Sequence, residues 1–222
     1  IMILEDAAEA LGNFILKGKN KNKHVGTVGT LGCLSFNGNK IITSGGGGMI
    51  LTNNKNLALK AKLLTTQAKK DPIFFIHDEI GYNYRLTNIQ AAVGVGQIEN
   101  IKKEIKLKKN IYLNYKKLLS NKKNINFKSI NNFATSNYWL NLVEIKSINK
   151  NNSLKKIINS LKKNNIESRP IWHLNHLQNK YLKCQRYKII NAVKLVKNTL
   201  CLPSSPQLSL QDIKKVVDKL DG

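Results

Sequence analysis

The sequence predicts an α/β protein made of part of a large domain followed by a smaller α/β domain. Short apolar runs alternate with amphipathic helical stretches, which is typical of strands and helices in mixed α/β folds. A change in composition across residues 120–132 indicates a join between two units. We therefore expect a large-domain part over 1–119, including a long connecting helix, and a small C-terminal domain over 120–222. A chain of 222 residues can bury one good core, or one core and a smaller second one.

In the first unit, the apolar residues 1–4 predict a buried strand with Asp6 close to its carboxyl end. Ligands of open α/β sheets bind at that end of the strands. Because the sequence opens directly on this strand, we expect it to be the C-terminal portion of a longer polypeptide. A second strand is predicted at 49–52 and a helix at 55–67, with Asn53 and Asn54 as its candidate caps.

A long helix is predicted to connect the two units. Thr87 and Gln90 form a capping-box pattern, and the apolar periodicity that follows continues to about Leu119. In the second unit we expect strands at 138–145 and 167–172, helices at 153–163 and 191–200, and a final helix from Ser209 to Leu220.

The charge is strongly basic, with 37 Lys and Arg against 13 Asp and Glu and a net charge of +24. The lysines are spread over helices and loops without a stacking platform of aromatic residues and arginines, so they predict a solvated surface rather than a nucleic-acid groove. Their field favours anionic substrates such as nucleotide diphosphates. No apolar run approaches the roughly 18 residues of a membrane span, and we expect no membrane partner.

The cysteines and histidines indicate neither disulfides nor a metal. Cys33, Cys184 and Cys201 are far apart and odd in number, which favours reduced thiols and a cytoplasmic location. His173 and His176 are three residues apart, but no second ligand pair accompanies them, so we expect no metal site.

The most informative segment carries Lys40 between a short strand and the glycine run 45–48. Such a run allows positive φ angles or a close approach of the backbone. A lysine held there is a candidate imine-forming amine. With Asp6 at a strand end and the Ser35 hydroxyl five residues before the lysine, these are the groups that pyridoxal phosphate needs at its ring nitrogen, aldehyde and phosphate. Composition by itself leaves other cofactors open.

Five segments resemble one known family in order along the chain. They are Glu5 to Gly12, Ser35 to Lys40 with its glycine run, Gly81 to Ala92, Arg169 to Trp172, and Leu202 to Ser205. They resemble the DegT/DnrJ/EryC1/StrS family of sugar aminotransferases, which have the pyridoxal phosphate-dependent fold type I. The resemblance implies part of that large domain, followed by the small domain.

The resemblance also implies roles for individual residues. Asp6 pairs with the pyridine nitrogen of pyridoxal 5'-phosphate, and Ser35 binds its phosphate. Lys40 forms the imine with the cofactor and then moves the proton. Asn83 reaches the phosphate in the neighbouring subunit, which makes a homodimer with a shared active site. Glu9 and Asn37 are placed among the cofactor-binding residues, and Trp172, His173 and His176 are candidate contacts to the nucleotide sugar.

The implied reaction moves an amino group from glutamate to a 4-keto-6-deoxy nucleotide sugar, for surface polysaccharide or glycan biosynthesis. Asn37 and the glycine run resemble the branch that uses UDP-linked sugars, as in bacillosamine and legionaminic acid synthesis. A GDP-perosamine synthase remains open as an alternative, whereas Lys40 argues against a related dehydratase. Relatives carry an N-terminal half with further cofactor contacts, so we expect this chain by itself to be inactive. A degenerate fragment or a non-catalytic basic binding module also remains open.

Overall fold

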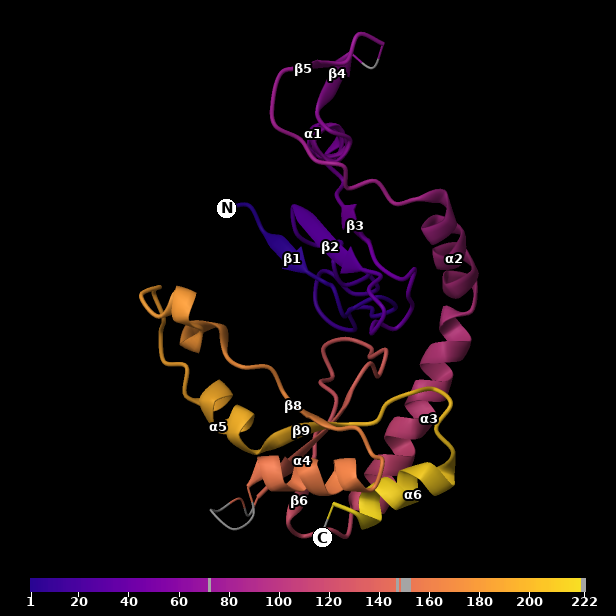
Figure 1. Cartoon of the computed structure of the whole chain (residues 1–222), viewed down its shortest axis with the longest axis vertical. Coiled ribbons are helices and arrows are strands. Elements are labelled where there is room, and N and C mark those ends of the chain that lie inside the picture. The colour runs from indigo at the N-terminus through magenta and orange to yellow at the C-terminus, as the bar shows by residue number, and fades with distance from the viewer. Residues whose placement is uncertain (72, 147, 149–152, 221–222) are drawn as a thin grey trace. The chain divides into compact units, whose positions relative to one another are not determined.

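A computed structural model describes residues 1–71, 73–146, 148 and 153–220 (Figure 1). The chain forms two compact units. The first comprises 1–106 and 131–139, and the second comprises the described residues of 107–130 and 140–222. These units divide inside a helix rather than at the expected boundary of 119 and 120. The assignment of the two parts as a large and a small domain stays a prediction.

The first unit contains a three-stranded sheet. Its strands are β1 (Leu4–Asp6), β2 (Leu31–Ser35) and β3 (Gly48–Leu51), in the order β1-β2-β3 (Figure 1). Strand β1 is parallel to β2, and β3 is antiparallel to it. Every second residue of β2 is buried, so one face of the sheet faces a small apolar core. The buried members of that core are Ala7, Leu34, Phe36 and Ile42.

The predicted buried strand at residues 1–4 is wrong in its extent and its burial. The strand starts only at Leu4, which is 66% exposed, and residues 1–3 are exposed as well. The reason is the position of β1 at the edge of the sheet, where it pairs with β2 on one side. An apolar sequence therefore lies on an open edge.

The helices of the first unit begin where the polar caps predict. Asn54 caps α1 (Lys55–Thr65), because its side-chain oxygen accepts the backbone N–H of Asn56 and Leu57. The capping box of Thr87 and Gln90 opens α2 (Asn88–Glu99). Between these helices, β4 (Lys69–Asp71) and β5 (Ile76–His77) form an antiparallel hairpin that the sequence did not predict.

The expected single long helix is two helices. Helix α2 ends at Glu99, Asn100 is its C-cap, and α3 (Ile101–Leu119) begins at the next residue. The Asn100 side chain donates to the Gly96 carbonyl at 2.9 Å, four residues earlier in the chain. An asparagine side chain competes in this way with the backbone for helix carbonyls, which explains the interruption.

The second unit contains a fully antiparallel sheet of four strands in the order β6-β7-β9-β8. They are β6 (Ile125–Phe127), β7 (Asn141–Ile145), β8 (Arg169–Pro170) and β9 (Thr199–Leu202). The first two residues of β9 were predicted as the end of a helix over 191–200, but α5 (Asn191–Asn198) stops before them. Residues Thr199 and Leu200 are buried against β7, and this tertiary pairing decides their conformation.

Helices cover this sheet and complete the larger core. They are α4 (Leu154–Lys163) and α6 (Leu210–Asp218), together with the part of α3 that belongs to this unit. Ser209 and Asp212 form the predicted capping box of α6. Fully buried core residues include Tyr115, Val143, Leu161, Leu200 and Ile213. Two short 3-10 turns, η1 (Asn175–Leu177) and η2 (Asn179–Tyr181), precede α5.

In the described part of the chain, none of the helices combines the length and the apolar character that a membrane crossing requires.

Candidate functional site

The loop that carries Lys40 leaves the sheet at the end of β2 and returns at β3. Two backbone hydrogen bonds join the two ends of this loop, from Phe36 N to Gly47 O (3.0 Å) and from Ser44 N to Phe36 O (3.1 Å). Gly45 and Gly47 have φ angles of 81° and 88°, which non-glycine residues rarely adopt. The glycine run therefore turns the chain back into β3 and fixes the position of Lys40 in the loop.

One further glycine is required by close packing. A Cβ atom at Gly48 would lie 2.5 Å from the Leu34 carbonyl oxygen, which is shorter than any tolerable contact. Gly48 pairs with Ser35 in the sheet. The absence of a side chain at Gly48 thus lets β3 pair closely with the strand that leads to Lys40.

Lys40 points into a partly enclosed position rather than into solvent. Its side chain is only 11% exposed, and its Nζ lies 2.6 Å from Oε1 of Glu9. The Trp139 ring covers the same ammonium group, with 4.7 Å between Nζ and the ring centroid. Glu9 itself is accessible, with 46% of its side chain exposed. The structure therefore brings together two of the predicted site residues, Lys40 and Glu9, and adds an aromatic residue that was not predicted.

Asp6 and Ser35 lie at the same edge of the sheet. Each is the last residue of its strand, and β1 and β2 are parallel, with Asp6 opposite Cys33 in the register. The Asp6 carboxylate is exposed and accepts the backbone N–H of Ala8 at 3.2 Å. The Ser35 oxygen accepts the N–H of Asn37 at 3.3 Å, so its own hydrogen is available to donate. This edge is where a sheet of this kind binds its ligand.

Two predicted asparagines lie on exposed segments. Asn37 starts the Lys40 loop, and its carbonyl accepts the Lys40 N–H at 3.1 Å. Asn83 forms an isolated bridge with Thr66, and its side chain accepts the Arg85 N–H at 3.4 Å. In the described residues, no hydrogen bond joins Asn83 to Lys40, Asp6 or Ser35. A role for Asn83 in a neighbouring subunit stays a prediction.

The predicted substrate residues belong to the second unit. Trp172 and His173 are exposed just after β8, and His176 is half-buried in η1. Among the described residues, no three His, Cys, Asp or Glu side chains are grouped closely enough to hold a metal ion. The contact of these three residues with a substrate stays a prediction.

Glu5 has a structural function that the sequence did not indicate. Its carboxylate accepts three backbone N–H groups, from Gly26 at 2.9 Å, from Val28 at 2.6 Å and from Gly29. Burial acts to raise the pKa of Glu5, but these bonds and the nearby His24 outweigh it, and the pKa is lower than usual. Glu5 thereby anchors the loop before β2 to the strand that ends in Asp6.

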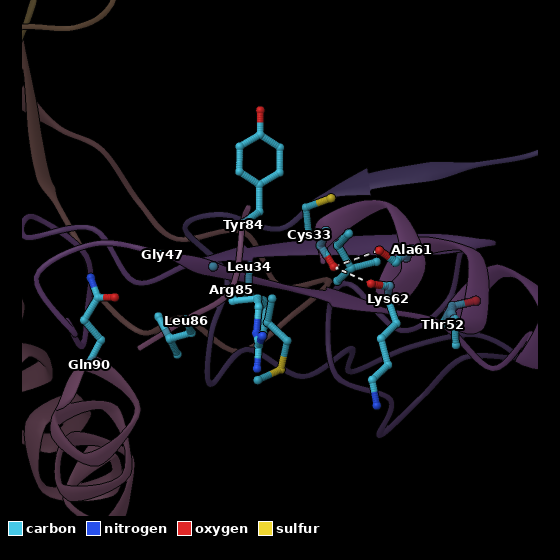
Figure 2. Close-up of a pocket in the computed structure, with 15 residues that line it drawn as sticks. Cys33, Leu34, Gly47, Thr52, Ala61, Lys62, Tyr84, Arg85, Leu86 and Gln90 are labelled. Carbon is cyan, nitrogen blue, oxygen red and sulfur yellow. Dashed lines mark hydrogen bonds between the residues drawn. The ribbon is translucent and has the colours of Figure 1, made fainter. Parts of the chain in front are cut away.

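A cavity of about 800 Å³ opens elsewhere in the first unit (Figure 2). Residues of β2, β3, α1, the segment before α2 and the first turn of α2 line it, among them Cys33, Lys62, Tyr84, Arg85 and Gln90. In the view of Figure 2, Lys62 and Tyr84 extend in opposite directions. None of the predicted cofactor residues is among its lining residues, so this cavity is distinct from the surroundings of Lys40.

The sequence profile of the DegT/DnrJ/EryC1/StrS aminotransferase family matches residues 1–221. The chain belongs to this family. Among curated relatives, the Bacillus subtilis protein EpsN is 34% identical over 99% of this chain, which spans 56% of that protein. A GDP-perosamine synthase of Escherichia coli O157:H7 is 34% identical over 100% of the chain and 58% of its own length. A UDP-4-amino-4,6-dideoxy-N-acetyl-beta-L-altrosamine transaminase of Campylobacter jejuni is 34% identical over 53% of the chain and 30% of its own length.

Solved structures of aminotransferases have the same fold. A DegT DnrJ EryC1 StrS aminotransferase from Brucella abortus matches with a TM-score of 0.83 and 25% identity, covering all of this chain and 57% of that one. The aminotransferase TlmJ from Streptoalloteichus hindustanus matches with a TM-score of 0.87 and 21% identity, over 99% of this chain and 57% of its own. The predicted fold class is thereby confirmed. This chain spans a little more than half the length of EpsN, of the Escherichia coli GDP-perosamine synthase and of these two solved structures.

The residues present fit pyridoxal phosphate. A carboxylate (Asp6), a hydroxyl with a free hydrogen (Ser35) and an enclosed amine (Lys40) lie on or beside one sheet edge. They match the pyridine nitrogen, the phosphate and the aldehyde of that cofactor. Glu9 is an acceptor for the Lys40 ammonium proton. The donor set in this part of the chain therefore suits the cofactor that the sequence predicted.

Proposed function

We propose that this chain supplies the lysine-bearing part of a pyridoxal phosphate-dependent aminotransferase that acts on a nucleotide sugar. The observation that carries the proposal is the enclosed Lys40 amine, 2.6 Å from Glu9, in a loop that follows the strand beside Asp6. Membership in an aminotransferase family supports it. EpsN is named as a pyridoxal phosphate-dependent protein, which supports the choice of cofactor.

Each residue of the site has one task in this proposal. Asp6 would hold the pyridine nitrogen in its protonated form, and Ser35 would donate to the phosphate. Asn37 would be a further cofactor-binding residue. Asn83 would reach the phosphate in the partner of a homodimer. When bound, pyridoxal phosphate supplies an electron sink and carries the amino group between two substrates.

Lys40 performs the proton transfers. Its Nζ must lose a proton before the amine is nucleophilic, and Glu9 Oε1 at 2.6 Å is placed to accept it. In each half-reaction the amine would take a proton from one carbon and deliver it to another: from the amino-bearing carbon of glutamate to the aldehyde-derived carbon of the cofactor in the first, and from that carbon to C4 of the sugar in the second. The enclosed position excludes water from this exchange, because the Lys40 side chain is only 11% exposed.

The substrates are glutamate as the amino donor and a 4-keto-6-deoxy nucleotide sugar as the acceptor. The basic surface, with a net charge of +24, favours an anionic nucleotide diphosphate. Trp172, His173 and His176 are the proposed contacts to it. We assign the enzyme to surface polysaccharide or glycan biosynthesis in the cytoplasm, where its free cysteines would stay reduced.

The nucleotide is either UDP or GDP. The loop residue Asn37 and the glycine run favour UDP, and the Campylobacter jejuni transaminase with a UDP-sugar name supports this choice. The second candidate is a GDP-linked sugar, because the similarity to the GDP-perosamine synthase extends over the whole chain. Assaying the purified whole protein with isotope-labelled glutamate and both 4-keto nucleotide sugars decides between them. Label transfer to neither sugar would overturn the proposed function.

Lys40→Ala tests the central residue of the proposal. We expect amino transfer to fall by at least about a hundredfold, because the proton carrier and the attachment point of the cofactor are lost together. In the wild type, peptide mass spectrometry after borohydride reduction should find the cofactor attached to the peptide that contains position 40. In the variant that attachment should disappear.

The matched control is Lys60→Ala. Lys60 also pairs with a glutamate, Glu79, but it is 52% exposed on α1. This variant should keep both activity and cofactor attachment. Full activity of Lys40→Ala would contradict the assignment.

A further inference from the structure

A segment about a hundred residues beyond Lys40 in the sequence lies against it in the first unit. The Trp139 ring centroid is 4.7 Å from Lys40 Nζ. The indole Nε1 of Trp139 donates to the carbonyl oxygen of Asn39 at 2.6 Å. One tryptophan therefore contacts both the amine and the backbone of the loop that presents it.

The same segment is also hydrogen-bonded to the backbone of Glu9, the ion-pair partner of Lys40. Asn137 is 3% exposed, and its Nδ2 donates to the carbonyls of Glu9 at 2.7 Å and Leu11 at 3.0 Å. Its Oδ1 accepts the N–H of Trp139 at 3.1 Å. Asn137 thus links the backbone of Glu9 to Trp139, so the two groups that contact the Lys40 ammonium are fixed by one buried amide.

We propose that Trp139 is a positioning residue for Lys40. The proposal rests on the proposed function, in which the Lys40 amine meets the cofactor and moves the proton. A lysine side chain has four rotatable bonds and would otherwise sample several directions. The face of the indole attracts the ammonium group, and this attraction is stronger where water is excluded. Trp139 therefore keeps Nζ in reach of Glu9 and away from solvent.

The first test measures the accessibility of the Lys40 amine in the whole protein without cofactor. The protein is acetylated with limiting acetic anhydride, and the rate at Lys40 is followed by peptide mass spectrometry. Trp139→Leu should raise the rate at Lys40 roughly five- to thirtyfold, the range that corresponds to the loss of a cation–π contact. Trp139→Phe should restore most of the protection, because the aromatic face remains although the indole N–H is lost.

Phe133→Leu is the matched control. Phe133 lies on the same segment, and its ring is beneath Lys17 Nζ at 5.9 Å. This variant should leave acetylation of Lys40 unchanged. An equal increase at Lys40 in Phe133→Leu would show general loosening of the segment and would overturn the proposal.

Equal acetylation of Lys40 in the wild type and Trp139→Leu would also overturn it. If circular dichroism shows that Trp139→Leu is unfolded, the same comparison is made between Trp139→Met and Trp139→Phe. A second measurement follows the rate at which cofactor attaches to Lys40, which should fall with Leu and recover with Phe. The acetylation needs neither cofactor nor substrate, so a lack of amino transfer would reject the proposed function while the Trp139 contact is still judged separately.

Discussion

At the scale of single residues, neighbouring side chains in the sequence have different tasks in the structure. Glu5 and Asp6 are adjacent, yet Glu5 anchors a loop through three backbone N–H groups, while Asp6 is exposed at the end of β1. Successive side chains of a strand point to opposite faces, which separates them. The sequence predicted an acidic pair at the strand end, but it did not predict that the two carboxylates have different roles.

Glu5→Gln should make stability less dependent on pH. The pKa of Glu5 in the folded protein lies below its ordinary value of 4.5, so the carboxylate stabilises the fold above that pH. This stabilisation is lost as the pH falls through the folded-state pKa. Urea titration should therefore give Glu5→Gln a lower free energy of unfolding than the wild type at neutral pH. In acid the two free energies of unfolding should become equal. A constant difference across the pH range would contradict the assigned role.

The cysteines should differ in reactivity. Burial raises the pKa of Cys201 to about 11 from its ordinary value of 9.0, so near neutral pH its thiolate fraction is about a hundredfold below that of an ordinary thiol. Cys184 is exposed. Iodoacetamide should modify Cys184 first and Cys201 slowly, as followed by peptide mass spectrometry. In denaturant the difference should vanish, and its presence there would refute the explanation by burial.

At the scale of elements, local signals located the helix starts well. The capping residues Asn54, Thr87 and Ser209 begin their helices as predicted. A cap is read from a few adjacent residues, because it satisfies the first N–H groups of its own helix. The strands β6 and β9 and the hairpin of β4 and β5 were missed, because short strands depend on partners that are distant in sequence.

Ser209→Ala tests one of these caps. The Ser209 hydroxyl bonds with Asp212 at the start of α6, a helix that contributes Ile213 to the core. We expect the free energy of unfolding to fall by about 1 kcal/mol in a denaturant titration. Ser120→Ala is the control, because Ser120 is exposed after the end of α3 and should change stability by less than about 0.5 kcal/mol. Equal losses would contradict the cap.

At the scale of the whole molecule, the two units have separate apolar cores of different size. The larger core combines residues of α3, α4, α6 and the four-stranded sheet, whereas the core of the first unit has four buried members. The first unit also carries many exposed apolar residues, such as Ile73, Phe74 and Ile80. We therefore expect the second unit to hold most of the stability that this chain has by itself.

Leu161→Ala should weaken the second unit strongly. Leu161 is fully buried in α4, and its truncation leaves a cavity that costs about 2 to 5 kcal/mol. Hydrogen exchange should show protection lost first in β7 and β9. Leu59→Ala, at a site that is 58% exposed on α1, serves as the control and should cost less than about 0.5 kcal/mol. Uniform loss of protection across both units would show that they unfold together.

The sequence by itself determined the family, the fold class, the helix caps and the loop that carries Lys40, because each of these is encoded by residues close together in the chain. Only the tertiary structure decided what surrounds the lysine. Glu9 precedes Lys40 by 31 residues and was expected near the same cofactor without a defined contact, whereas Trp139 follows Lys40 by about a hundred residues and no local pattern marks it. Their contacts with one ammonium group arise from the pairing of β1 with β2 and from the return of residues 131–139 to the first unit.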